Sequence, residues 1–306
     1  MKALRSADGL AFAALILGAL ALGWAPIGLR FSDAGPVATA FWRFVIGFPF
    51  ILAIALGEAR LTPPPAPGAS WRDWTGPAAL GGIAFALDFA LWHPALTLTS
   101  VTNATLFSNF APIVVVILVW IFLRKAPPAL FLVGLGLALT GSCLLAFFGA
   151  EGRADRASRL LGDLLAIGTA FWYALYMLAM RQARAKGRAF AVMSVVTLIG
   201  AGVLFVVSRL LGETLLPQSP QGWAAVISLG LVCQVVAQCA VTFSLGRIEA
   251  APAAVMLTLQ PIAAAIMAWV LFDERLSASM LAAAALTLIG VVTAQLAHLR
   301  AAPRRA

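Results

Sequence analysis

The chain has 306 residues, of which 62% are hydrophobic and only 11% are charged, and its mean hydropathy is +0.97. Soluble proteins carry about 25% charged residues, so this composition excludes an ordinary soluble domain and indicates an integral membrane protein. The net charge of +9 does not point to nucleic acid, because the basic residues are scattered through short connectors between apolar runs. The three cysteines lie in apolar segments at spacings typical of neither a metal site nor a disulfide, and no cofactor or metal is expected.

Runs of about 20 apolar residues, divided by polar or Pro/Gly connectors, predict ten membrane-spanning helices. The first run follows a charged start like that of a signal peptide, but no clean cleavage site follows, so we expect it to be retained. The connectors are too short for a soluble domain, and any site must therefore lie inside the helix bundle. The predicted spans are 9–29, 36–57, 74–96, 101–123, 128–149, 160–181, 189–211, 223–245, 251–272 and 278–299.

Two stretches of the chain repeat each other. Residues 104–120 read ATLFSNFAPIVVVILVW, and residues 253–269 read AAVMLTLQPIAAAIMAW. The aligned pairs, each 149 residues apart, include Pro112 with Pro261, Trp120 with Trp269, Trp74 with Trp223, Gly81 with Gly230, and Gly141 with Gly290. This indicates an internal duplication, with a first five-helix repeat over 1–150 and a second over 151–306.

The distribution of Lys and Arg predicts the orientation of both repeats. With the N-terminus inside, 14 basic residues fall on the inner face and 6 on the outer face, so both termini are expected in the cytoplasm. Because each repeat has an odd number of spans, the second must be inserted upside down relative to the first. Arg124-Lys125 on the inner face then corresponds to Asp273-Glu274 on the outer face. Inverted repeats are typical of secondary transporters, which bind substrate near the midplane between the halves.

Two longer segments carry a family resemblance. NATLFSNFAPIVVVILVWIFLRKAPP and APAAVMLTLQPIAAAIMAWVLFDERLS resemble the paired signature of the drug/metabolite transporter (DMT) superfamily, EamA type. The Glu-Leu ending of that signature is approximated by Glu274-Arg275-Leu276, whereas Lys125 replaces the glutamate in the first half. Within the superfamily the chain looks most like the bacterial aromatic-amino-acid exporter branch. The resemblance implies an exporter of amino acids in a bacterial cytoplasmic (inner) membrane.

The third predicted span contains ionisable residues at membrane depth, which are costly unless they are paired or hydrated. Asp88 lies past the middle of this span, shares a helix face with Trp92, and is followed by His93 near the outer end. These three residues are candidates for lining the cavity or binding substrate. The alternatives are that Asp88 bonds a neighbouring helix and that His93 lies at the membrane interface.

The fourth span offers polar side chains before a helix-breaking proline. Asn103 and Phe107 are four residues apart, and Asn109 precedes Pro112, which frees a backbone carbonyl one turn earlier. Pro261 does the same in the second half. Binding of substrate and simple bonding between helices are both compatible with this pattern.

Further candidates occur in the second half. Gln234 and Gln238 form an i, i+4 pair in span eight, and Gln260 precedes Pro261; glutamine both donates and accepts, as an ammonium-plus-carboxylate substrate requires. Trp172 and Tyr176 share a face of span six and could form an aromatic wall, although core packing is favoured. Arg43 in span two is expected to extend outward to lipid head groups rather than to bind a substrate carboxylate.

The sequence thus predicts an all-α membrane protein that exports amino acids, aromatic ones included, and similar metabolites by alternating access. A drug or organic-cation exporter of the same fold is the nearest alternative, because Asp88 and the aromatic residues would suit a cation. An intramembrane enzyme or a channel is disfavoured, since catalytic motifs and a continuous polar lining are missing from the sequence. The expected partners are a small-molecule substrate and the lipid bilayer, and the chain is expected to act as a monomer.

Overall fold

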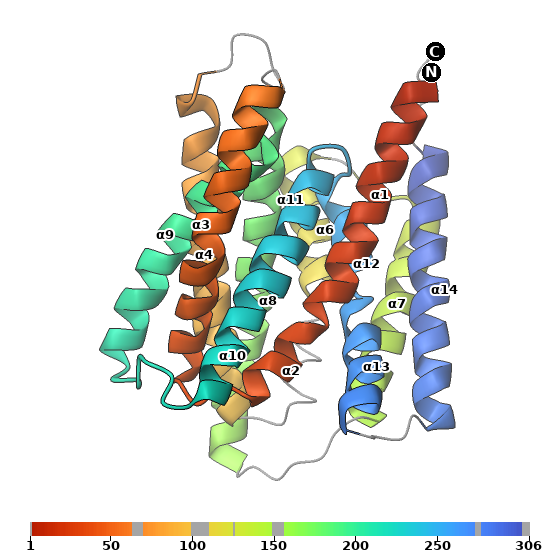
Figure 1. The fold of residues 1–306 in the computed structure, drawn as a ribbon. Coiled ribbons are helices and arrows are strands. Elements are labelled where there is room, and N and C mark those ends of the chain that lie inside the picture. Colours follow the sequence, from red (N-terminus) through yellow and green to blue (C-terminus); the bar gives the residue numbers. More distant parts are fainter. Residues whose placement is uncertain are drawn as a thin grey trace.

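The computed structural model describes residues 2–62, 70–98, 110–124, 126–148, 156–272 and 277–301. Within these residues every regular element is a helix, and the helices run up and down in one bundle (Figure 1). The start of α1 and the end of α14 lie at the same end of the bundle (Figure 1). The prediction of an all-helical membrane protein is therefore confirmed.

The first half of the chain forms six described helices. A break at Gly23 separates the first two, and Pro36 is the first residue of the third, where its missing N–H costs no helical hydrogen bond. The bounds are α1 Lys2–Leu22, α2 Trp24–Arg30, α3 Pro36–Leu61, α4 Arg72–Leu98, α6 Ala111–Leu123 and α7 Ala129–Phe148.

The second half contains long helices at its start and end, with shorter, interrupted ones between them. Ser219 caps α10, because its hydroxyl accepts a hydrogen bond from the amide of Gly222 at 3.0 Å. The bounds are α8 Arg156–Lys186, α9 Ala189–Leu210, α10 Pro220–Ser228, η1 Leu229–Ala237, α11 Gln238–Leu245, α12 Ala250–Leu257, α13 Gln260–Phe272 and α14 Ala278–Ala301.

Within the described ranges, eight stretches of helix are long and apolar enough to cross a membrane. They match eight of the ten predicted spans: 9–30, 36–61, 72–95, 164–186, 189–210, 220–245, 250–271 and 278–298. Among the described residues, the predicted spans 101–123 and 128–149 contain the shorter apolar helices Ala111–Phe122 and Ala129–Leu144. The first part of span 101–123 lies outside the described residues.

The outer faces of the helices carry large apolar side chains. Phe122 is 74% exposed, and Leu52, Leu198 and Val270 are also exposed on different helices. A soluble monomer rarely shows extensive apolar surface of this kind, whereas the hydrocarbon core of a bilayer accommodates it.

The span from Pro220 to Leu245 is not a uniform α-helix. Its middle part, η1, is a π-helix of nine residues, and the amide of Gln238 bonds back to the carbonyl of Cys233. The sequence analysis expected a regular helix here. Such π-helical segments are uncommon and often occur at functional sites.

Two glutamates link α3 and α9 in a reciprocal way. The Glu213 carboxylate accepts hydrogen bonds from the first amides of α3, Val37 at 3.1 Å and Ala38 at 2.8 Å. At the opposite end, Glu58 accepts from the first amides of α9, Ala189 at 3.1 Å and Phe190 at 3.0 Å. Each carboxylate satisfies orphan amides and complements the positive end of the helix dipole.

Helices α7 and α14 pack through small residues. A Cβ atom added at Gly141 would collide with Thr287, and one added at Gly290 would collide with Ala138. Gly134 likewise abuts Ala294. The two helices can approach this closely only because these positions lack a side chain.

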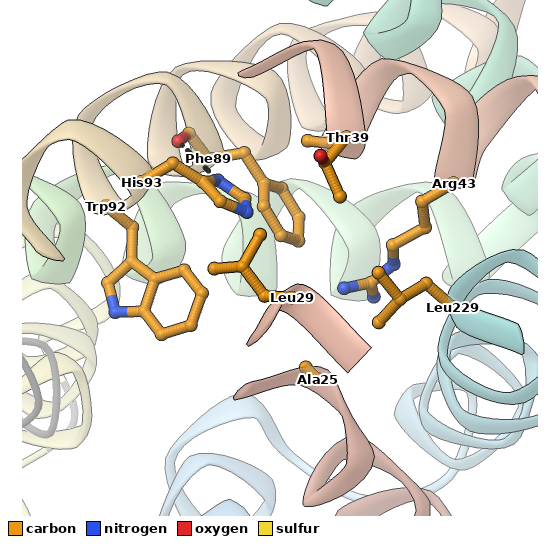
Figure 2. Close-up of a pocket in the computed structure, with 9 residues that line it drawn as sticks. Ala25, Leu29, Thr39, Arg43, Phe89, Trp92, His93 and Leu229 are labelled. Atoms are coloured by element: carbon orange, nitrogen blue, oxygen red, sulfur yellow. Dashed lines mark hydrogen bonds between the residues drawn. The ribbon is translucent and has the colours of Figure 1, made fainter. Parts of the chain in front are cut away.

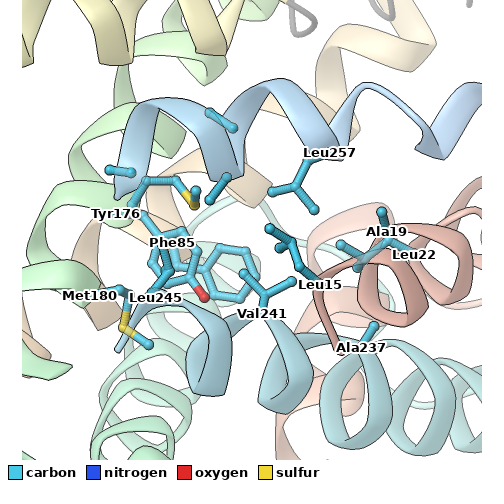
Figure 3. Close-up of a cluster of buried hydrophobic side chains, with 14 of the residues drawn as sticks. Leu15, Ala19, Leu22, Phe85, Tyr176, Met180, Ala237, Val241, Leu245 and Leu257 are labelled. Atoms are coloured by element: carbon cyan, nitrogen blue, oxygen red, sulfur yellow. The ribbon is translucent and has the colours of Figure 1, made fainter. Parts of the chain in front are cut away.

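The helices of the two halves meet in an apolar core (Figure 3). Leu15 of α1 and Phe85 of α4 are fully buried there with Tyr176 of α8 and Leu245 of α11. The Ser244 hydroxyl donates to the carbonyl of Ala11 at 2.7 Å, joining α11 to α1.

Candidate functional site

A small pocket lies between α2, α3, α4 and η1 (Figure 2). Its empty volume is about 230 Å³, including the space at its open mouth. Arg43 and Trp92 stand on opposite sides of it (Figure 2). The lining residues are Ala25, Leu29, Thr39, Ala40, Arg43, Phe89, Trp92, His93 and Leu229.

Arg43 is buried in the wall of this pocket, and only 3% of the residue is exposed. Its Nε donates to Gln234 Oε1 at 3.2 Å and its Nη2 to the Cys233 carbonyl at 3.4 Å. Its guanidinium carbon also lies 4.8 Å from the centre of the Phe89 ring, a cation–π distance. The expectation that Arg43 extends to lipid head groups is therefore wrong.

The local sequence explains why Arg43 turns inward. Gly47, one turn along α3, lies against Gln234, and Gly230 lies against Ile46 and the Arg43 carbonyl. Because neither glycine has a side chain, α3 and η1 approach closely. The guanidinium consequently finds hydrogen-bond acceptors on η1.

Gln234 is fully buried and its orientation is defined at both ends. Its Oε1 accepts from Arg43, and its Nε2 donates to Thr197 Oγ1 at 3.2 Å. Three helical segments, α3, η1 and α9, are thus joined by one chain of polar contacts. The sequence pattern predicted an i, i+4 pair with Gln238, yet the two amides bond to different helices.

Gln238 is 1% exposed and belongs to a second network. Its Oε1 accepts a hydrogen bond from the Tyr176 hydroxyl at 3.0 Å. The Tyr176 ring stacks on Phe85 with centroids 4.3 Å apart and planes at 12°. Tyr176 is therefore a core residue with a polar tip, whereas Trp172 is only half-buried and meets Phe171 edge to face.

Asp88 and His93 both lie on α4 but differ in their surroundings. Asp88 is half-buried, and it makes no ion pair within 4.0 Å and no hydrogen bond with the other described residues. The Nδ1 atom of His93 lies 3.0 Å from the Phe89 carbonyl, and its ring stacks on Phe89 with centroids 5.3 Å apart. Because His93 is only 4% exposed, it lies inside the bundle and not on its outer surface.

The remaining candidates fall in or near the fourth and ninth spans. Gln260 is half-buried at the start of α13, and Pro261 is the second residue of that helix, directly after the break that follows α12. Pro112 is likewise the second residue of α6. Asn103, Phe107 and Asn109 lie outside the described residues.

The structure adds residues that the sequence analysis did not select. Thr39 lines the pocket, and its hydroxyl lies 2.7 Å from that of Ser32. Thr39 precedes Arg43 by four residues, so a search for polar residues on the face of Arg43 would have found it. Thr197 lacks such a signal, because its partner is remote in sequence. No group of three metal-ligating side chains occurs within the described ranges.

Comparisons with known proteins identify the family. The model of the EamA-like transporter family matches residues 8–147 and again 160–294. An uncharacterized transporter from Archaeoglobus fulgidus is 24% identical over 252 residues, covering 81% of this chain and 83% of the relative. A solved structure, described only as the crystal structure of a protein, shares the fold with a TM-score of 0.75 at 20% identity, covering 95% of this chain and 98% of that one. The chain belongs to the EamA-like transporter family.

Proposed function

We propose that this transporter exports amino acids, aromatic ones included, and similar small metabolites by alternating access. The observation that carries the proposal is a pocket with a buried cation, a hydroxyl and aromatic rings inside a largely apolar bundle. Such a combination suits a small molecule that has both a charged group and an apolar side chain. The names of the family and of the archaeal relative indicate a transporter rather than an enzyme.

The proposed architecture is ten spans in two inverted five-helix repeats. Contacts between α7 and α14 support it, because they are reciprocal under the offset of 149 residues. Gly141 meets Thr287, and Gly290 meets Ala138. At the offset of 149 residues, Gly141 corresponds to Gly290 and Ala138 to Thr287, so each contact is the equivalent of the other. A two-fold relation between the halves requires this pattern. The matched glutamate contacts of α3 and α9 also support it.

Alternating access is supported by a pocket that lies toward one end of the bundle. The pocket lies between α2, the start of α3 and the end of α4, whereas Leu15, Phe85 and Tyr176, nearer the middle of their helices, are fully buried in the apolar core. A transporter that opens to one side at a time needs a seal on the opposite side. The core around Leu15 and Phe85 is the proposed seal on the cytoplasmic side. The excess of basic residues on that side supports an inner-membrane orientation with both termini in the cytoplasm.

The proposed substrate site extends from this pocket toward the midplane. Trp92 and His93 line the pocket and Gln234 contacts Arg43, which supports assigning these three residues to the proposed site. The other residues proposed to line the cavity are Asp88, Asn103, Phe107, Asn109, Trp172, Tyr176, Gln238 and Gln260.

An exporter of drugs or organic cations is the alternative, favoured by the aromatic rings on α4 and by Asp88, which has no ion pair with another described residue. The two functions are separated by reconstituting the purified protein in liposomes and measuring uptake of labelled amino acids and organic cations. We expect uptake of amino acids. Uptake of cations alone would favour the alternative, and uptake of neither would remove both proposals.

A further inference from the structure

We infer that Arg43 forms a carboxylate-binding subsite, which makes the transported molecule a carboxylate-bearing one such as an α-amino acid. The inference rests on the proposed function and assigns one group of the substrate to one residue. It is carried by the position of the guanidinium, which is buried and directed into the pocket (Figure 2). Its hydrogen bonds to the other described residues lie along one edge.

The hydrogen bonds of Arg43 leave one edge of the guanidinium available. Arginine has five N–H donors in a planar fork. The Nε donor is used by Gln234, and one donor of Nη2 makes a long contact with the Cys233 carbonyl. Within the part of the chain that the structure describes, no acceptor lies within hydrogen-bond distance of Nη1. The Nη1–Nη2 edge is the one that can make two parallel bonds to a carboxylate.

The charge of Arg43 is likewise not neutralised by an ion pair with any other residue that the structure describes. Asp88 acts on it electrostatically, but none of its carboxylate oxygens lies within 4.0 Å of an Arg43 nitrogen. A buried cation without a close counter-ion is costly, and an anionic ligand in the pocket would offset that cost. A cationic ligand at the same place would be repelled.

The lining favours a carboxylate over a more highly charged anion such as phosphate. Arg43 is the only lysine or arginine among the nine lining residues. One guanidinium balances the single charge of a carboxylate, whereas a phosphate dianion would remain half uncompensated in an apolar site. Phe89 and Trp92 provide apolar contact for the rest of the molecule.

Gln234 is the residue that positions Arg43. Its Nε2 is fixed by Thr197, so its oxygen, and not its NH₂ group, faces the Arg43 Nε. The neutral amide anchors the guanidinium without cancelling its charge. A glutamate at the same position would anchor it equally well but would act as a built-in competitor for the substrate carboxylate.

The test compares amino acids with their amides, which keep the ammonium and the side chain but lose the carboxylate charge. Liposomes containing the full-length protein are assayed for transport of L-phenylalanine, L-leucine and L-threonine, and of the amide of each. We expect the wild-type protein to prefer the acids. Arg43→Gln should weaken the apparent affinity for the acids by roughly 10- to 100-fold and leave that for the amides unchanged.

Two further variants complete the design. Gln234→Glu retains Arg43 and the packing, and it should also abolish the preference for acids; it carries the test if Arg43→Gln does not fold. Arg209→Gln removes the same charge from an exposed site at the same end of the bundle, and it should keep the wild-type preference.

The outcomes distinguish this inference from the proposed function. If the wild type prefers acids and both Arg43→Gln and Gln234→Glu keep that preference, amino-acid export stands and the role of Arg43 is overturned. If the wild type transports the amides and not the acids, both are overturned in favour of a cation exporter. If it transports neither, the proposed function fails, and the carboxylate subsite fails with it.

Discussion

At the scale of single residues, an arginine and an aspartate near the same pocket have contrasting surroundings. Arg43 is held by η1 and by the Phe89 ring, whereas Asp88, the residue before Phe89, makes no hydrogen bond within the described ranges. A carboxylate at this depth needs water, a substrate ammonium or a proton to be stable. The first prediction concerns this residue.

Asp88→Asn preserves shape and most hydrogen bonding but removes the charge. We expect the variant to fold and insert normally and to lose transport or its pH dependence, measured in liposomes with and without a pH gradient. A proton carrier would lose gradient-driven accumulation while keeping exchange at equal pH, and an ammonium ligand would lose both. Unchanged transport with an intact pH profile would show that Asp88 is structural.

Tyr176→Phe tests the second buried network. The substitution removes the hydroxyl that donates to Gln238 Oε1, and it leaves that buried acceptor without its partner. Hydrogen bonds between membrane helices contribute about 0.6–2 kcal/mol, so a modest decrease in the melting temperature is expected. Tyr176→Ala, which also removes the ring stacked on Phe85, should lower it much further. Equal effects of the two substitutions would contradict a contribution of the hydroxyl.

The sequence revealed the types of these residues but not their partners. A lone arginine and a lone aspartate inside apolar runs are visible in any hydropathy profile, and the sequence marks both as unusual at membrane depth. The direction of Arg43 was predicted wrongly, because it depends on Gly47 and Gly230 lying at the crossing of α3 and η1. Contacts of this kind join positions about 190 residues apart and leave no local signal.

At the scale of elements, small residues decide which helices touch. The α7–α14 contact predicts different outcomes for two substitutions. Gly290→Ala would force a methyl group into the backbone of Ala138 and should cost about 1–3 kcal/mol through overpacking. Gly136→Ala on α7 meets nothing within 4 Å and should be neutral or slightly stabilising. The thermal stability of both variants in detergent tests this, and similar stabilities would contradict the close contact.

The reciprocal glutamates give a further prediction about elements. Glu58→Gln and Glu213→Gln should each destabilise the protein by roughly 1 kcal/mol, since each replaces one accepting oxygen by an NH₂ group that faces a helical amide. Asp73→Asn is the control, because its ion pair with Lys186 at 3.8 Å is exposed and an asparagine oxygen can still accept the exposed hydrogen bond from the Ser70 amide. The three variants are compared by thermal unfolding in the same detergent.

The connection between α2 and α3 should respond to pH. The Ser219 hydroxyl, together with the amide of Gln218, holds the pKa of Asp33 below its ordinary value of 3.8. A lowered folded-state pKa means that the carboxylate stabilises the fold above its ordinary pKa and that this contribution is lost as the pH falls through the folded pKa. Asp33→Asn should therefore lower the melting temperature slightly at pH 7, and the difference should vanish well below pH 3.8. A difference independent of pH would contradict this assignment.

At the scale of the whole molecule, the proposed inversion of the halves is tested by accessibility. Lys125 and Glu274 occupy equivalent positions of the two repeats and lie outside the described residues. Single cysteines placed there, in a background without the three native cysteines, should be labelled by an impermeant reagent from opposite sides of the membrane. Only position 274 should react in intact cells. Reaction of both from one side would contradict the inverted arrangement.

The sequence predicted the overall plan of the bundle well, because apolar length and turn residues determine it. Eight predicted spans coincide with long apolar helices, and Pro36 and Pro220 each begin a helix. The π-helical segment could not be predicted. Trp74 aligns with Trp223 and Pro112 with Pro261 at the same offset of 149 residues. The second half therefore has no extra residue between these positions that would indicate the π-helical segment. Its geometry depends on packing against α3.

The π-helical winding of η1 has a consequence for the conformational cycle. Residues 229–237 correspond, by the offset of 149, to residues 80–88 of α4, which are wound as an ordinary α-helix. Two equivalent segments thus hold different windings at the same time. If the two halves exchange conformations when the transporter opens to the other side, residues 80–88 would become π-helical and residues 229–237 would become α-helical. The change of winding would end at Asp88 in the first half and just before Gln238 in the second half. Each change of conformation would therefore rotate one of these two polar side chains about its helix axis.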